Sequence, residues 1–212
     1  MAVVGDPLEL AAFGPVIPVI VLHRLADAVP LARALVAGGV RVLELTLRTP
    51  AALDCIGAIA RAVPEAIVGA GTVRSAADVA AVQRAGAAFA VSPGWSADIA
   101  QACRDAALPL LPGVATASET MASAAAGHSF VKFFPAVAAG GIAMLKALAG
   151  PFPDVSFCPT GGLTAETAPQ YLALPNVKVC GGSWLTPEDA IAAQDWPRIT
   201  RLAHEAGALL SR

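Results

Sequence analysis

The run Phe130-Val131-Lys132-Phe133-Phe134-Pro135 is one of eight short apolar runs that decide the fold of this 212-residue chain. Ala-rich segments that carry helix start and stop signals separate these runs. Strands that alternate with helices predict parallel strands joined by βαβ crossovers, and eight repeats predict a (β/α)8 TIM barrel. The other seven expected strands are Val16–Leu22, Val40–Arg48, Ala66–Gly71, Phe89–Pro93, Pro109–Val114, Val155–Pro159 and Val177–Cys180.

An extra helix is expected near Pro7–Phe13, before the first strand, and a last helix over about Pro197–Leu210. The prediction is therefore an α/β fold, a (β/α)8 TIM barrel with an extra N-terminal helix. Residues 1–212 are expected to form this single domain, because no linker or change of composition divides them. An open doubly wound sheet is the alternative, and the count of eight repeats disfavours it.

Several residues mark the expected ends of helices. Thr49 followed by Pro50 predicts an N-cap and a first helical residue. Thr116 with Glu119 fits a capping box, and Gly86 is typical of a residue that ends a helix at positive φ.

The composition excludes several classes of protein. Apolar residues make up 56% of the chain and charged residues 14%, which argues against disorder. The formal net charge is −2 and no basic stripe is present, so no nucleic-acid partner is expected. The early apolar stretch from Pro15 to Leu22 is too short to span a bilayer, and no signal peptide precedes it. We expect a soluble, cytoplasmic protein with no membrane partner. The mean hydropathy of +0.65 suggests apolar contacts between subunits.

The four cysteines show no pattern of a disulfide framework or zinc site. They are widely spaced and contain no C-x-x-C pair, so small buried hydrophobes are expected. They are Cys55, Cys103, Cys158 and Cys180. The three histidines, His23, His128 and His204, are scattered without ligand spacing and are read as structural or solvated.

Lys132 is the strongest candidate for a catalytic residue. It is one of three lysines in the chain, and apolar residues flank it on both sides. Desolvation by such neighbours disfavours the charged ammonium, and a neutral amine in a closed pocket attacks carbonyl compounds to form a Schiff base. The alternative is a lysine whose stem lies on apolar surface while its amine stays in water.

Strand parity predicts a polar inner face in the second strand. Leu43, Leu45 and Leu47 share one face, while Glu44, Thr46 and Arg48 share the other. If the leucines pack on helices, the polar groups point inward. By the same parity Lys132 points inward with Phe130 and Phe134, and it then lies near Glu44 across the barrel. A buried Glu44–Arg48 ion pair, or a strand end that reaches water, is the alternative for the second strand.

Small residues close most of the expected strands at their carboxyl ends, where active sites of such barrels lie. Gly69-Ala70-Gly71-Thr72 closes the third strand, and Ser92-Pro93-Gly94 closes the fourth. The last two strands end in Pro159-Thr160-Gly161-Gly162 and Gly181-Gly182-Ser183. Glycines let backbone N–H groups approach an anion, so these last two loops predict a phosphate site. Ordinary tight turns are the alternative.

These motifs occur in an order that resembles the 2-keto-3-deoxy-6-phosphogluconate (KDPG) aldolases and the overlapping 4-hydroxy-2-oxoglutarate (KHG) aldolases. The resemblance covers about Val16 to Ala206 and departs at no position that matters. It rests on Leu43-Glu44-Leu45-Thr46-Leu47-Arg48-Thr49, Gly69-Ala70-Gly71-Thr72, Val131-Lys132-Phe133-Phe134-Pro135-Ala136, Cys158-Pro159-Thr160-Gly161-Gly162 and Gly181-Gly182-Ser183-Trp184.

The resemblance implies a lyase, a class I aldolase of carbohydrate metabolism. It implies cleavage of 2-dehydro-3-deoxy-6-phosphogluconate to pyruvate and D-glyceraldehyde 3-phosphate in the Entner–Doudoroff pathway, usually by a cytoplasmic homotrimer. Lys132 would be the Schiff-base lysine and Glu44 the general acid/base. Arg48 and Thr72 would hold the pyruvyl carboxylate, and Thr160 would contact a substrate hydroxyl. Phosphate would bind at Gly161, Gly162, Gly182 and Ser183, and Pro93 and Phe134 complete the expected substrate-binding set.

No cofactor and no metal are expected, because an iminium at Lys132 would itself withdraw electrons from the bond to be cut. Three alternatives remain open. The first is an aldolase for the galactonate epimer or for 4-hydroxy-2-oxoglutarate, and Thr160 favours the gluconate form by resemblance. The second is a non-covalent sugar-phosphate epimerase or isomerase. The third is a phosphosugar-binding barrel without catalysis.

Overall fold

The computed structural model describes residues 5–210. Strands and helices alternate along nearly all of this range, as the sequence predicts. The strands are β1 Val16–Ile20, β2 Val42–Thr46, β3 Ile67–Gly71, β4 Ala90–Val91, β5 Leu110–Leu111, β6 Gly113–Val114, β7 Phe130–Phe133, β8 Ser156–Pro159 and β9 Cys180–Gly182. The α-helices are α1 Ala28–Ala37, α2 Ala52–Ala62, α3 Ala76–Ala85, α4 Ala97–Asp105, α5 Ala117–Ala125, α6 Gly141–Ala149, α7 Ala168–Leu172, α8 Glu188–Ala192 and α9 Trp196–Gly207.

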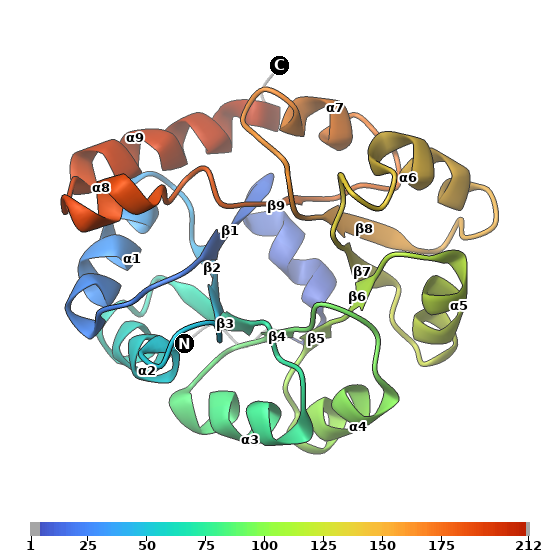
Figure 1. Ribbon diagram of the computed structural model, residues 1–212, viewed down its shortest axis with the longest axis horizontal. Coiled ribbons are helices and arrows are strands. Elements are labelled where there is room, and N and C mark those ends of the chain that lie inside the picture. Colours follow the sequence, from blue (N-terminus) through green and yellow to red (C-terminus); the bar gives the residue numbers. More distant parts are fainter. Residues whose placement is uncertain (1–4, 211–212) are drawn as a thin grey trace.

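The strands are parallel throughout. One sheet has the order β5-β4-β3-β2-β1-β9 and a second has the order β6-β7-β8. The strands curl around a common centre and the α-helices lie outside them (Figure 1). Within residues 5–210 the strands number nine rather than the expected eight. The structure therefore confirms an α/β fold with a curled parallel sheet.

None of the eight expected strands has its predicted bounds: six are shorter than expected and lie inside the predicted run, and the other two differ more. The run Pro109–Val114 is split into β5 and β6 at Pro112, which has no N–H to donate to a ladder. The last strand was expected at Val177–Cys180 and lies at β9 instead, because Gly181 pairs with Ile17 of β1 and continues the ladder. Val177 forms only an isolated parallel bridge to Phe157.

The N-terminal helix is present, in the tighter 3-10 form. It is η1, Pro7–Phe13, and two shorter 3-10 helices follow as η2, Leu25–Asp27, and η3, Ala208–Leu210. Asp6 caps η1 in a capping box with Glu9. Figure 1 shows η1 lying across one end of the ring of strands.

The expected helix ends are correct in two cases and wrong in one. Thr116 and Glu119 form the predicted capping box, and Gly86 ends α3 with φ 91°. The prediction for Thr49 is wrong, because α2 begins later, at an N-cap of Ala51. The Thr49 hydroxyl instead donates to the carbonyl of Leu22, and so joins the ends of the first two strands.

Buried side chains form one apolar layer inside the strands and two outside them. The inner cluster contains Val42, Phe130 and Cys158 together with Leu10 of η1. The outer clusters pack the other strand face against the helices, and Leu43 belongs to one of them. All four cysteines are buried, as expected. No helix within residues 5–210 is both long and apolar enough to cross a membrane.

Candidate active site

Strand alternation places Glu44 and Lys132 on the inner face. Leu43 and Leu45 pack in the outer cluster, while Val42 lies in the inner one, so Glu44 points inward from β2. Phe133 packs outside and Phe130 inside, so Lys132 points inward from β7 in the same way. The predicted parity of both strands is therefore confirmed.

Lys132 and Glu44 form a buried ion pair. Lys132 Nζ donates to Glu44 Oε1 at 2.9 Å, across 88 positions of sequence. The two side chains are only 5% and 4% exposed. The surface-lysine alternative is thus wrong, and so is the alternative that pairs Glu44 with Arg48. A carboxylate in hydrogen-bond reach of an amine can accept its proton, and this leaves a neutral amine next to a neutral acid.

Small residues on the adjacent strands make space for the side chains of Lys132 and Glu44. A Cβ on Gly71 would collide with the carboxylate of Glu44, so glycine is required on the adjacent strand. Lys132 is in register with Gly113 of β6 and Cys158 of β8. Its Nζ lies 5.3 Å from the centre of the Phe134 ring, within the range of a cation–π contact.

Cys158 is an inert neighbour of the amine. Desolvation by burial raises the pKa of the Cys158 thiol to about 12, and the opposing charge of Lys132 is the smaller effect. The thiol therefore remains protonated at neutral pH and is a poor nucleophile.

Arg48 and Thr72 are joined at the carboxyl ends of β2 and β3. Arg48 Nε donates to Thr72 Oγ1 at 3.3 Å. Thr72 has φ 61°, an uncommon left-handed conformation for a β-branched residue. Arg48 is exposed and Thr72 is half-buried, so both reach the mouth of the site. Such backbone strain is often found at ligand sites.

Pro93 reaches the site through Gly113. A Cβ on Gly113 would collide with the carbonyl of Pro93, so the loop after β4 lies directly on β6 beside Lys132. Ser92 holds this loop, because its Oγ accepts from Gly113 N at 3.3 Å and donates to Gly94 O at 2.8 Å.

The two glycine loops line a pocket of about 130 Å³ at the same end of the sheet. Gly161 and Gly162 adopt φ of 101° and 83°, which other residues rarely reach. A bridge between Thr160 and Gly181 joins the two loops. The pocket is lined by Val19, Val21, Arg48, Phe134, Thr160, Gly161, Gly162, Leu163, Gly181, Gly182 and Ser183.

The structure thus gathers all the predicted site residues at one end of the strands. Seven of them line the pocket, and Phe134 connects the pocket to Lys132 and its partner Glu44. Thr72 is connected to the pocket by its hydrogen bond with Arg48, and Pro93 lies beside Lys132 because it packs on Gly113. Sequence reasoning missed Val21 and Leu163 as pocket walls, because apolar residues at strand ends carry no chemical signal.

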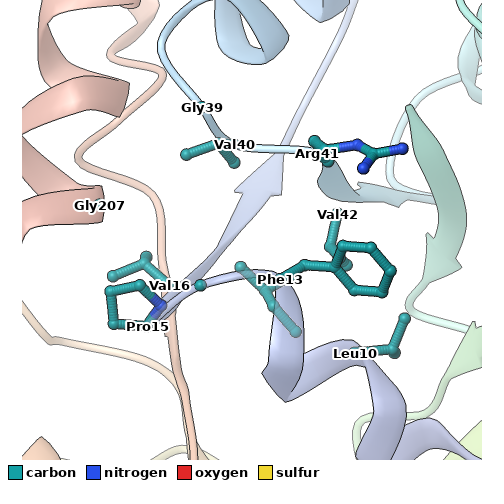
Figure 2. Close-up of a pocket in the computed structure, with 11 residues that line it drawn as sticks. Leu10, Phe13, Pro15, Val16, Gly39, Val40, Arg41, Val42 and Gly207 are labelled. Carbon is teal, nitrogen blue, oxygen red and sulfur yellow. The ribbon is translucent and has the colours of Figure 1, made fainter. Parts of the chain in front are cut away.

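A second, much smaller cavity lies at the opposite end of the strands (Figure 2). It measures about 20 Å³, room for about one water molecule. Leu10 and Phe13 of η1 line it, and the Arg41 guanidinium lies 5.5 Å from the centre of the Phe13 ring. It contains no buried nucleophile or acid, so the chemistry belongs to the other end.

The chemistry available at the carboxyl end is specific. A buried amine can form an imine with a ketone, the adjacent carboxylate can carry protons, and the guanidinium of Arg48 can bind a carboxylate. Backbone N–H groups of the glycine loops can bind an anion a few ångströms away. Within residues 5–210 no group of three or more His, Cys, Asp or Glu side chains could hold a metal ion.

Comparison with known proteins agrees with this chemistry. The family model described as KDPG and KHG aldolase matches residues 9–202. The KHG/KDPG aldolase of Escherichia coli is 55% identical over 193 residues, which cover 91% of this chain and 91% of the relative.

Two solved structures are similar over almost the whole chain. KDPG aldolase from Legionella pneumophila, with pyruvate captured as a covalent carbinolamine intermediate, is 48% identical with a TM-score of 0.93. It covers 95% of this chain and 98% of its own. The aldolase of Zymomonas mobilis with 3-phosphoglycerate is 45% identical, with a TM-score of 0.92 and 97% of each chain covered.

Proposed function

The chain belongs to the KDPG and KHG aldolase family, and we propose that it cleaves 2-dehydro-3-deoxy-6-phosphogluconate to pyruvate and D-glyceraldehyde 3-phosphate. It is a lyase of the aldolase type. The observation that carries the proposal is the buried ion pair between Lys132 and Glu44 beside the glycine-lined pocket. This pair supplies both the amine that holds the ketone and the group that moves protons.

We also propose that the curled sheet closes into the complete (β/α)8 barrel with η1 as its extra helix. Pro112 alone separates β5 from β6, so the two segments count as one strand of eight. The bridge between Thr160 and Gly181 supports closure between β8 and β9. Closure places Glu44 and Lys132 on facing sides of one interior, as their hydrogen bond requires.

The reaction begins with formation of an imine. Glu44 accepts a proton from Lys132, and the neutral amine attacks the C2 ketone of the substrate to give a carbinolamine. Loss of water then yields an iminium cation, and Glu44 can donate the proton that the departing hydroxyl needs. The carbinolamine named in the Legionella pneumophila structure is the same kind of intermediate.

Cleavage uses the iminium as the electron sink. Glu44 removes the proton of the C4 hydroxyl, the C3–C4 bond breaks, and its electrons form an enamine of pyruvate on Lys132. The aldehyde product, D-glyceraldehyde 3-phosphate, leaves. Glu44 then returns a proton to C3, and hydrolysis of the resulting iminium releases pyruvate and free Lys132. One carboxylate serves all these steps because it lies 2.9 Å from the amine.

Two anion sites orient the substrate around the amine. Arg48 and Thr72 hold the pyruvyl carboxylate, and Arg48 can do so with two parallel hydrogen bonds. Gly161, Gly162, Gly182 and Ser183 hold the phosphate through backbone N–H groups. Thr160 contacts a substrate hydroxyl, while Pro93 and Phe134 form walls. Binding at both ends aligns the C3–C4 bond for cleavage.

Borohydride trapping tests the assignment of the nucleophile. Reduction in the presence of pyruvate converts the imine to a stable amine, and mass spectrometry of peptides should find the added mass on Lys132. Lys132→Met, which keeps an apolar stem without an amine, should give no adduct. An adduct on Lys146 or Lys178, or none on the active protein, would show that Lys132 is not the nucleophile.

No metal is required in this mechanism, because the iminium at Lys132 already withdraws the electrons. Turnover should be undiminished after exhaustive treatment with a chelator. Loss of activity that added metal restores would contradict the proposed electron sink.

Experiments can distinguish the alternative substrates and functions. Comparing cleavage rates for the gluconate and galactonate epimers and for 4-hydroxy-2-oxoglutarate ranks the aldolase substrates. A sugar-phosphate epimerase or isomerase, or a binding protein without catalysis, gives Lys132 no covalent role and would yield no trapped adduct. A cytoplasmic location and a homotrimer are part of the proposal, and sedimentation of the purified chain tests the latter.

A further inference from the structure

Trp184 packs directly against Gly182, the last residue of β9. A Cβ on Gly182 would collide with three carbons of the indole ring, so the ring lies against the Cα of that glycine. The ring is half-buried and packs on both outer core clusters. Its other side lines a groove with Pro169 of α7 and Leu209 of η3. The indole is therefore held by the core and in turn supports Gly182.

Consecutive residues at the end of β9 face two different cavities. Gly182 and Ser183 line the catalytic pocket, whereas Trp184 lines the groove behind them. Ser183 is exposed, and its carbonyl accepts from Thr186 N at 3.1 Å, which closes the turn. Gly182 ends β9 in register with Pro18 of β1, so the ladder stops there and no side chain of Gly182 fixes the turn that follows.

We propose that Trp184 is a positioning residue for the phosphate end of the substrate. Its indole holds the backbone of Gly182 and Ser183 at the distance from which their N–H groups meet the anion. This inference rests on the proposed function, which assigns phosphate to that loop. Lys132 and Glu44 lie on β7 and β2 and do not line the groove that Trp184 lines, so the proposed role of Trp184 concerns the phosphate end alone.

The test compares two substrates that differ in the phosphate. In Trp184→Phe the ring is smaller and Gly182 loses part of its support. The KM for 2-dehydro-3-deoxy-6-phosphogluconate should rise about tenfold, because a displacement of about 1 Å in a positioning group has large effects. The kcat/KM for 4-hydroxy-2-oxoglutarate, which has no phosphate, should change less than about twofold. Inorganic phosphate should become a correspondingly weaker competitive inhibitor.

A matched tryptophan controls for general loss of packing. Trp196 is also half-buried against the outer core, at the start of α9. Trp196→Phe removes the same atoms and should leave the ratio of the two substrates unchanged.

A second pair of changes keeps the test decisive if Trp184→Phe folds poorly. Gly182→Ala alone should raise the KM for the phosphorylated substrate, because its methyl group collides with the indole. Adding Trp184→Leu makes room for that methyl group, so the double variant should lose less than the sum of the two single changes. Gly182 is not among the glycines at positive φ, so alanine fits its backbone.

Each outcome has a distinct meaning. Equal kcat/KM of the wild-type protein for both substrates, together with no inhibition by inorganic phosphate, would refute the phosphate site and with it this inference. A wild-type protein that depends on the phosphate, with Trp184→Phe losing activity equally toward both substrates, would refute the inference and leave the proposed function intact. Additive losses in the double variant would also refute it.

Discussion

The two ends of the strands face the same interior, but one is lined by apolar side chains and the other by charged groups and glycines. At the amino end, Leu10 of η1 is fully buried among apolar side chains, and the cavity there measures about 20 Å³. At the carboxyl end, the interior contains the ion pair of Lys132 and Glu44, and glycine loops surround about 130 Å³. The amino end of the strands is therefore packed for stability, and the carboxyl end contains the groups proposed to carry the chemistry.

The charged end is not an efficient source of stability. Desolvation of a buried ion pair commonly offsets its attraction, so apolar residues of equal volume would stabilise the fold as well or better. The pair of Lys132 and Glu44 is thus best explained by the reaction proposed for it. The apolar packing around Leu10 needs no such explanation, because burial of a leucine contributes roughly 1.5–3 kcal/mol by itself.

Glu44→Gln should give the largest effect, and it acts on activity. Gln keeps the size of the side chain but cannot accept a proton, so cleavage should slow by roughly 10²–10⁴-fold. Imine formation with pyruvate, measured by borohydride trapping, should slow less than cleavage. Thr46→Val on the same inner face is the control, since Thr46 Oγ1 only bonds the carbonyl of Ile20. If the rates of trapping and of cleavage fell equally, Glu44 would have a packing role and not a role in proton transfer.

Leu10→Ala should act on stability and leave the chemistry alone. Removal of a fully buried leucine costs about 2–5 kcal/mol, which denaturant unfolding will measure. Leu8→Ala on the same helix is the control, because Leu8 is 38% exposed and should lose less than about 0.5 kcal/mol. If folded Leu10→Ala showed a kcat well below that of the wild type, the amino end would also affect catalysis, and the division of roles between the two ends would be wrong.

Asp27→Asn should give the smallest effect, and one that depends on pH. Hydrogen bonds from Arg24 Nε and Nη2, both 2.7 Å, hold the pKa of Asp27 below its ordinary value of 3.8, and burial opposes them. A depressed folded pKa adds stability above the unfolded value, and this is lost as pH falls through the folded pKa. The variant should therefore be less stable at neutral pH, and its deficit should shrink as pH falls below about 4.

Unfolding curves between neutral pH and about pH 2 measure this trend. Asp189→Asn is the control, because the Asp189 side chain is 70% exposed whereas that of Asp27 is 4% exposed, so its ion pair should contribute less to stability. A deficit for Asp27→Asn that stays constant with pH would mean that packing, and not charge, accounts for it.

Much of the site was predictable because strand parity is a strict rule. Once Leu43 and Leu45 face the helices, Glu44 must face inward, and the same holds for Lys132 next to Val131. What parity cannot give is a distance between strands far apart in sequence. The contact of Lys132 with Glu44 at 2.9 Å depends on how the whole sheet curls.

The errors of prediction have a common physical cause, since partners from other strands overrode local signals. Thr49 carries a capping side chain, yet it bonds the carbonyl of Leu22. Gly181 is typical of a loop, yet it extends β9 because β1 offers it a ladder. Pocket walls such as Val21 and Leu163 lack any chemical signal at all.

The absent side chain of Gly71 limits how this catalyst can be redesigned. The carboxylate of Glu44 occupies the space where a Cβ would stand, so directed evolution that admits any other residue there displaces the proposed proton carrier. New aldehyde acceptors are better sought through Val21 and Leu163, which line the pocket and are not themselves members of the ion pair. Libraries built at those two positions would vary the width of the pocket while the machinery on β2 and β7 stays intact.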